Sequence, residues 1–157
     1  MFKKIFYVII ISIFIQNCDY EPIYSKNEKF AFTITELEFS GDKDINNYLR
    51  KNLNKFTKVN TDKKFSLSID TSFSKSSLAK NKSGNTTDYK LTLGLNLKLK
   101  HQEKGKNEMK HEEIYFTENF IITKNDSTFE QTNYENLMKN NLTEILLNRV
   151  IIYLKTK

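Results

Sequence analysis

With 157 residues, of which 38% are hydrophobic and 28% charged, the chain is long enough for one packed domain and too apolar for disorder. Four glycines, one proline and one cysteine exclude collagen-like, linker-like and disulfide-stabilised proteins. The net charge of +6 suggests an anionic neighbour, such as nucleic acid, a lipid headgroup or an acidic glycolipid.

Residues 1–17 have the pattern of a secretory signal peptide. Lys3 and Lys4 precede an apolar run over residues 5–15, and no acidic side chain occurs before residue 18. This run is shorter than the roughly 18 apolar residues of a membrane-spanning helix, as is every other stretch of the chain. It fits the about 7–15 residues of a signal peptide's hydrophobic region. A buried core helix is the alternative, which the flanking lysines and polar residues disfavour.

The only cysteine, Cys18, follows this run and resembles the cysteine of a bacterial lipobox. In that motif the thiol is alkylated by diacylglycerol, the signal is cut before the cysteine and the new amine is acylated. We expect the same here, which leaves 140 of the 157 residues, with 23 positive and 19 negative side chains and a net charge of +4. A free thiol in an uncleaved leader is the alternative. Acyl chains would anchor the protein firmly in a membrane.

The segment after the cysteine predicts a tether, a strand and a helix. Residues 18–29 are polar and contain the only proline, which is typical of a tether. Alternating apolar residues predict a strand from residue 30, with a bulge near Thr35 and Glu36, where the alternation shifts. Apolar residues at helical spacing then predict a helix over residues 43–56.

Three further strands and a last helix follow. The second strand is expected from residue 65 to about 75 and the fourth over about 108–117, with turns at 80–85 and 103–107. The third strand, over residues 89–100, alternates strictly between apolar and small or polar side chains. The last helix begins after 125–127 and continues to the C-terminus. Its predicted apolar stripe consists of Tyr134, Met138, Leu142, Ile145, Leu146, Val150 and Tyr153, with Arg149 inside the stripe, where it must reach solvent or an acceptor.

The order β-α-β-β-β-α predicts an α+β fold over residues 30–157. We expect a two-layer α/β sandwich, a four-stranded mixed sheet with two helices on one face. No helix remains for the opposite face. Its polar side chains, Lys90, Lys98 and Lys100 among them, must face water or a partner.

The sequence carries no motif of an enzyme, a cofactor site or a metal site. Phosphate-binding and nucleophile motifs are absent, and Glu112 and Glu113 would point to opposite faces of a strand. His101 and His111 could approach each other across a hairpin, but two histidines alone make a weak metal site, and solvated strand ends explain them as well. The strand aromatics fall in the apolar phase, so an RNA-binding sheet is not expected.

The segment Cys18–Tyr24 reads C-D-Y-E-P-I-Y and resembles the start of the mature LPS-assembly lipoprotein LptE family. That family shows cysteine, then glycine, an aromatic residue, any residue, proline, an aliphatic residue and tyrosine. Asp19 replaces the glycine. The segment over 87–93 and the ending Arg149–Leu154 are also similar to the family, although Asp88 stands where many members carry arginine.

The resemblance implies an outer-membrane lipoprotein that faces the periplasm. Family members plug the LptD β-barrel, help to assemble it and assist the transport of lipopolysaccharide to the outer leaflet. In enteric bacteria an aspartate after the cysteine retains lipoproteins in the inner membrane, so Asp19 leaves that location open. A pilotin-like accessory lipoprotein of another envelope complex is the alternative function.

Two groups of lysines are the predicted contact sites. Lys124, beside the apolar residues 120–122, would join two lysines of the turn over 80–85 in binding lipopolysaccharide phosphates, although ordinary solvated lysines would look the same. The polar sheet face would contact the barrel. The predicted lipopolysaccharide-binding residues are Lys80, Lys82 and Lys124, and the predicted barrel-binding residues are Lys90, Lys98 and Lys100.

Overall fold

Apolar and polar side chains alternate along four strands, so each strand has one apolar face. The four strands form a single sheet. The computed structural model describes residues 31–102 and 109–157. Neighbouring strands pair in the order β1-β2-β3-β4, with β1 parallel to β2 and the other pairs antiparallel. The strands are β1 (Thr33–Gly41), β2 (Lys64–Lys80), β3 (Thr86–Gln102) and β4 (Met109–Thr123). The helices are α2 (Lys43–Leu53), the short 3₁₀ helix η1 (Asn54–Thr57) and α3 (Thr128–Thr156).

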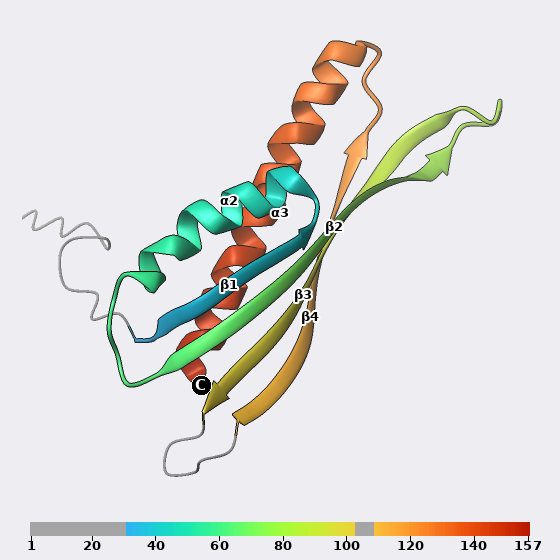
Figure 1. Cartoon of the computed structure of the whole chain (residues 1–157). Helices are drawn as coiled ribbons and strands as arrows, with labels where there is room; N and C mark the ends of the chain where they lie inside the picture. Colours follow the sequence, from blue (N-terminus) through green and yellow to red (C-terminus); the bar gives the residue numbers. More distant parts are fainter. Residues whose placement is uncertain (1–30, 103–108) are drawn as a thin grey trace, which may run out of the picture.

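Both long helices lie against the same face of the sheet (Figure 1). The fold is therefore the predicted two-layer α+β sandwich with the order β-α-β-β-β-α. Twenty apolar side chains, from Phe32 to Leu154, form one buried cluster to which every strand and both long helices contribute. The described residues between 32 and 154 thus form one continuous hydrophobic core.

The strands of the sheet are longer than the sequence predicts. β2 and β3 have 17 residues each, so β2 continues to Lys80 and β3 begins at Thr86, and β4 continues to Thr123. The residues added to β2 and β3 are mostly polar and lack an apolar alternation, whereas those added to β4 include Phe120, Ile121 and Ile122. Backbone hydrogen bonding between neighbours extends a ladder regardless of side-chain pattern. The β2–β3 hairpin consequently projects away from the start of α3 (Figure 1).

The first strand begins at Thr33 rather than at the predicted residue 30, and its bulge lies where the sequence predicts it. The pairing register of β1 with β2 shifts between Ile34 and Glu36, which confirms the bulge. The strand ends at Gly41, whose φ is +91°. A Cβ atom at this position would lie 1.8 Å from the carbonyl oxygen of Thr71, so only glycine fits.

The two helices begin at the predicted positions, and a polar side chain caps each of them. Asp42 accepts hydrogen bonds from the backbone N–H groups of Asp44 and Ile45, at 3.0 and 3.1 Å, and Ser127 caps α3. The predicted helix over 43–56 ends as α2 at Leu53, and its last turn is the 3₁₀ helix η1.

The predicted buried stripe of α3 is partly wrong. The side chains of Tyr134 and Ile145 are 42% and 45% exposed, whereas Leu147 and Leu154, which the predicted stripe omits, are buried. Apolar residues occur on every side of this helix, so spacing alone could not identify the side that faces the core. Arg149 reaches an acceptor, since its guanidinium lies 2.7 Å from the Glu118 carboxylate of β4.

Candidate functional site

The sheet face that no described helix covers is polar along three strands. Register pairing places successive rows of β2, β3 and β4 side by side on this face, which we call the open face. From β2 it carries Ser66, Ser68, Asp70, Ser72, Ser74 and Ser76. From β3 it carries Lys90, Thr92, Gly94, Asn96, Lys98 and Lys100, and from β4 His111, Glu113, Tyr115, Thr117, Asn119 and Ile121.

The lysines predicted to bind a barrel all lie on the open face. Lys98 and Lys100 are exposed and Lys90 is half-buried. Lys98 lies 3.8 Å from the Glu113 carboxylate, which also accepts a hydrogen bond from the Asn96 amide at 2.7 Å. The open face is therefore a wet surface of mixed charges and hydroxyl groups.

An aromatic side chain lies on the open face, contrary to the sequence-based expectation. Tyr115 is 63% exposed, and its hydroxyl group is 2.3 Å from the place where a Cβ atom on Gly94 would stand. The absence of a side chain at Gly94 leaves room for this ring. The neighbouring Phe116 occupies the apolar phase, and the alternation places Tyr115 on the other face.

The three lysines predicted to bind lipopolysaccharide lie at the same end of the sheet. Lys80 is the last residue of β2, and Lys82 lies in the turn that follows. The backbone N–H of Lys124 donates to the carbonyl of Thr87, at 2.7 Å. Thr87 follows Thr86, which pairs with Lys80, so Lys124 lies near Lys80. All three side chains are exposed.

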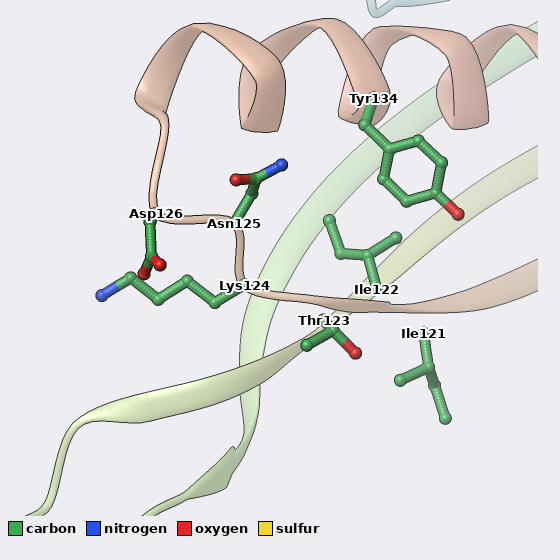
Figure 2. Close-up of a pocket in the computed structure, with 7 residues that line it drawn as sticks. All are labelled: Ile121, Ile122, Thr123, Lys124, Asn125, Asp126 and Tyr134. Carbon is green, nitrogen blue, oxygen red and sulfur yellow. The ribbon is translucent and has the colours of Figure 1, made fainter.

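A shallow hollow of about 560 Å³ opens beside Lys124, between the end of β4 and the first turns of α3. Figure 2 shows Tyr134 of α3 above Ile122, with Ile121 pointing away from the helix. Residues 120–122 therefore do not form the single apolar patch that the sequence suggested. Ile122 is 1% exposed and belongs to the core, whereas Ile121 is 59% exposed on the open face.

The two histidines do not form a site. The ring of His101 packs edge-on against Phe65, with centroids 5.7 Å apart, on the helix-covered face. His111 pairs in register with Lys100 on the open face. The two histidines therefore lie on opposite faces of the sheet, and the approach that the hairpin would have allowed does not occur. Within residues 31–102 and 109–157, no group of three or more His, Cys, Asp or Glu side chains could hold a metal ion.

Glu112 and Glu113 point to opposite faces, as expected, and only Glu112 is enclosed. The Tyr153 hydroxyl donates to Glu112, the Lys157 ammonium lies 2.6 Å from it and the Lys110 ammonium 3.6 Å. Hydrogen bonds from Lys157 and then Tyr153 lower the pKa of the Glu112 carboxyl to about 2. This cluster fastens the end of α3 to β4, and nothing in the local sequence indicates it.

Several predictions concern residues outside the described segments. Cys18, the signal peptide over 1–17, the tether over 18–29 and the turn over 103–107 all belong to that part of the chain. In the segments that the structure covers, neither long helix has the run of apolar residues needed to span a bilayer.

At the level of sequence, no protein family model and no curated protein matches the chain. Solved structures do match. The crystal structure of rare lipoprotein B from Shewanella oneidensis aligns with 77% of this chain and 94% of its own, with a TM-score of 0.59. This chain shares the fold of rare lipoprotein B. The identity over that alignment is 13%, so the likeness concerns the arrangement of strands and helices.

A second lipoprotein has a similar structure. The solution NMR structure of the uncharacterized lipoprotein B from Nitrosomonas europaea has a TM-score of 0.50 and 14% identity. It covers 82% of this chain and 87% of its own. Both alignments extend over most of the lipoprotein's length, so the shared fold includes nearly the whole of each.

Proposed function

We propose that this chain is an LptE-like lipoprotein of the bacterial outer membrane, anchored through Cys18 and facing the periplasm. In this role it plugs and helps to assemble the LptD β-barrel and assists lipopolysaccharide transport. The fold shared with rare lipoprotein B, a protein of the LptE type, supports the proposal, as does the segment Cys18–Tyr24. Because Asp19 follows the cysteine, the membrane fraction must be determined along with the partner.

The open face is the observation that carries the proposed partnership. Its rows of serine, lysine, asparagine and threonine span three strands, and no described element packs on them. The interior of an outer-membrane barrel is polar, so such a face can lie against it through hydrogen bonds and water. Tyr115 adds a large, exposed ring near the middle of the face, the kind of side chain that anchors many protein interfaces.

A pull-down from detergent-solubilised envelope tests the partnership. The tagged chain should retrieve the LptD barrel, and K98E/K100E should reduce the recovered barrel because it reverses two exposed charges of the open face. The matched control is K43E/K51E, which reverses two exposed charges on α2, in the other layer.

Recovery of the barrel by the control, but not by the open-face variant, supports the proposal. Equal recovery by both variants would contradict this contact face. Recovery of a different envelope complex in place of the barrel would favour the pilotin-like accessory role.

The intact mass of the membrane-extracted protein tests the anchor. We expect residues 1–17 to be absent and Cys18 to carry a diacylglyceryl group and an amide-linked fatty acid. A retained leader, or a mature chain with a free thiol, would contradict the lipoprotein assignment. Sucrose-gradient separation of the membranes from the same cells assigns the protein to the inner or the outer membrane.

Lys80, Lys82 and Lys124 remain the proposed lipopolysaccharide contacts. They extend from one end of the sheet, where the exposed side chain of Ile121 offers apolar surface for an acyl chain. Asp88, which lies among them, is occupied by hydrogen bonds from the Thr87 and Thr123 hydroxyl groups.

A triple variant tests this site, because exposed charge pairs contribute little one at a time. K80D/K82D/K124D should lose lipopolysaccharide binding at low salt, and high salt should have the same effect on the unchanged protein. Circular dichroism confirms that the fold is intact. Unchanged binding by the folded variant would eliminate these residues as the contact.

A further inference from the structure

One end of the sheet gathers lysines from five separate segments. At this end β1 begins, and its first residue, Thr33, pairs with Lys64 at the start of β2. Here also β3 ends and β4 begins, with Gln102 paired to Met109, and Tyr153 in the last turn of α3 contacts Glu112 of β4 (Figure 1). We call this region the basic end. Its lysines are Lys55, Lys58, Lys63, Lys64, Lys100, Lys110, Lys155 and Lys157.

The basic end holds the entire positive surplus of the described residues. Against its eight lysines stand three carboxylates, those of Glu36, Asp62 and Glu112. Elsewhere in segments 31–102 and 109–157, eleven positive and eleven negative side chains balance one another. The carboxylate of Glu112 faces Tyr153, Lys157 and Lys110 and neutralises part of the lysine charge, and the carboxylate of Glu36 accepts from the Ser66 hydroxyl. With all three carboxylates counted, eight lysines leave the basic end a net charge of +5.

The chain also enters the domain at the basic end. Phe32 is fully buried there, with its ring 4.6 Å from the ring of Phe56 and 5.7 Å from that of Phe65. These contacts fix the point from which the preceding residues leave. Cys18 is 13 residues before Ala31, a length that reaches at most about 45 Å even when fully extended. An anchor at Cys18 would therefore keep this end within about 45 Å of the bilayer.

We propose that the basic end binds the anionic phospholipid headgroups of the membrane that carries the anchor. This inference rests on the proposed lipid anchor for its location, and on the charge distribution for its chemistry. The lysine side chain is a flexible point charge, which suits the mobile phosphates of lipid headgroups. Binding of this kind does not require a preformed pocket. Because screening limits such attraction to about 8 Å at physiological salt, only a surface held close to the bilayer can use it. The tether meets that requirement by keeping the local concentration high.

Co-sedimentation of residues 19–157 with vesicles tests this proposal without the anchor. This segment retains the continuous core of residues 32–154, and circular dichroism verifies its fold. We expect binding to phosphatidylcholine vesicles that contain phosphatidylglycerol, weak or no binding to pure phosphatidylcholine, and release at about 1 M salt, where the Debye length is about 3 Å.

Charge reversals at the basic end and on α2 supply matched variants. The side chains of Lys58, Lys63 and Lys155 are exposed and make no hydrogen bond or ion pair in the described structure. K58E/K63E/K155E should lower the partition coefficient about a hundredfold. The control, K43E/R50E/K51E, changes the net charge equally at exposed positions of α2 and should lower it by less than about threefold.

Equal losses in the two variants would overturn the proposal, because they would show a response to net charge alone. Binding to both vesicle types, or binding only to lipopolysaccharide, would also overturn it. The intact mass of the full-length protein reports separately on the anchor. A chain that binds these vesicles but lacks acyl chains in the cell would contradict the proposed lipoprotein while retaining the basic end's affinity for headgroups.

Discussion

At the scale of single residues, Glu112 makes the stability of the fold depend on pH. The pKa of its carboxyl is about 2, against 4.5 for an unperturbed glutamate, chiefly because the Lys157 ammonium and the Tyr153 hydroxyl donate to it. The folded protein therefore binds this proton less tightly than the unfolded chain does. The stabilisation is fully present above about pH 4.5 and is lost as the pH falls from 4.5 toward 2.

Glu112→Gln should lower the free energy of unfolding at pH 7 by about 2 kcal/mol, since the site is close to solvent. The variant should also show a smaller decline of stability between pH 4.5 and 2, measured by urea denaturation at several pH values. Glu113→Gln is the control, because the Glu113 side chain is 58% exposed. Parallel pH profiles for the wild type and Glu112→Gln would contradict the assignment.

The contact between Tyr115 and Gly94 can be measured by a double-mutant cycle. A Cβ atom at position 94 would lie 2.3 Å from the Tyr115 hydroxyl and 2.8 Å from the Ser72 hydroxyl. Gly94→Ala should therefore displace the ring and destabilise the protein by about 1 kcal/mol. In a Tyr115→Ala background the cost should fall by about half, because only Ser72 remains in the way. Additive effects in thermal denaturation would show that the ring does not lie over Gly94.

At the scale of elements, Asp42 connects α2 to α3. Its carboxylate caps α2 and lies 2.8 Å from the Lys139 ammonium of α3. Partial burial opposes ionisation of Asp42, but the hydrogen bonds from Lys139 and from the N–H groups of Ile45 and Asp44 outweigh it and lower its pKa. Burial likewise opposes the charge on Lys139, and the two aspartates outweigh it and raise its pKa.

Asp42→Ala should cost about 2 kcal/mol of unfolding free energy, because it removes the cap and leaves a Lys139 side chain that is only 13% exposed without its nearest acceptor. Asp44 also lies near Lys139, at 3.2 Å, but its side chain is 85% exposed. Asp44→Ala should therefore cost less than about 0.5 kcal/mol. Equal losses in chemical denaturation would mean that the cap contributes little.

At the scale of the whole molecule, one core joins every strand and both long helices, so unfolding should be a single transition. Leu95, in the central strand β3, is fully buried, and Leu95→Ala should cost about 3 kcal/mol. Ile152 of α3 is 62% exposed, and Ile152→Ala should change the stability by less than about 0.5 kcal/mol. Far-ultraviolet and tyrosine near-ultraviolet circular dichroism should give the same urea midpoint. Separate midpoints would show that α3 unfolds independently of the sheet.

The sequence determined the local elements where side-chain pattern and backbone chemistry agree. Leucines at every second position from 91 to 99 could only form a strand with one buried face, and all five are at most 1% exposed. Asp42 and Ser127 marked the helix starts because short polar side chains accept from free backbone N–H groups. The change in the alternation of apolar residues near Glu36 indicated the bulge, because an extra residue in a strand reverses the face on which the following side chains lie.

Only the tertiary structure decided which distant side chains meet. The buried side of α3, the enclosure of Glu112 by the end of that helix and the place of Tyr115 over Gly94 all depend on contacts between elements far apart in the chain. The basic end is the clearest case, since its lysines are dispersed from residue 55 to residue 157. Net charge is a sum over the sequence, whereas the field that a partner meets depends on where the fold places each charge.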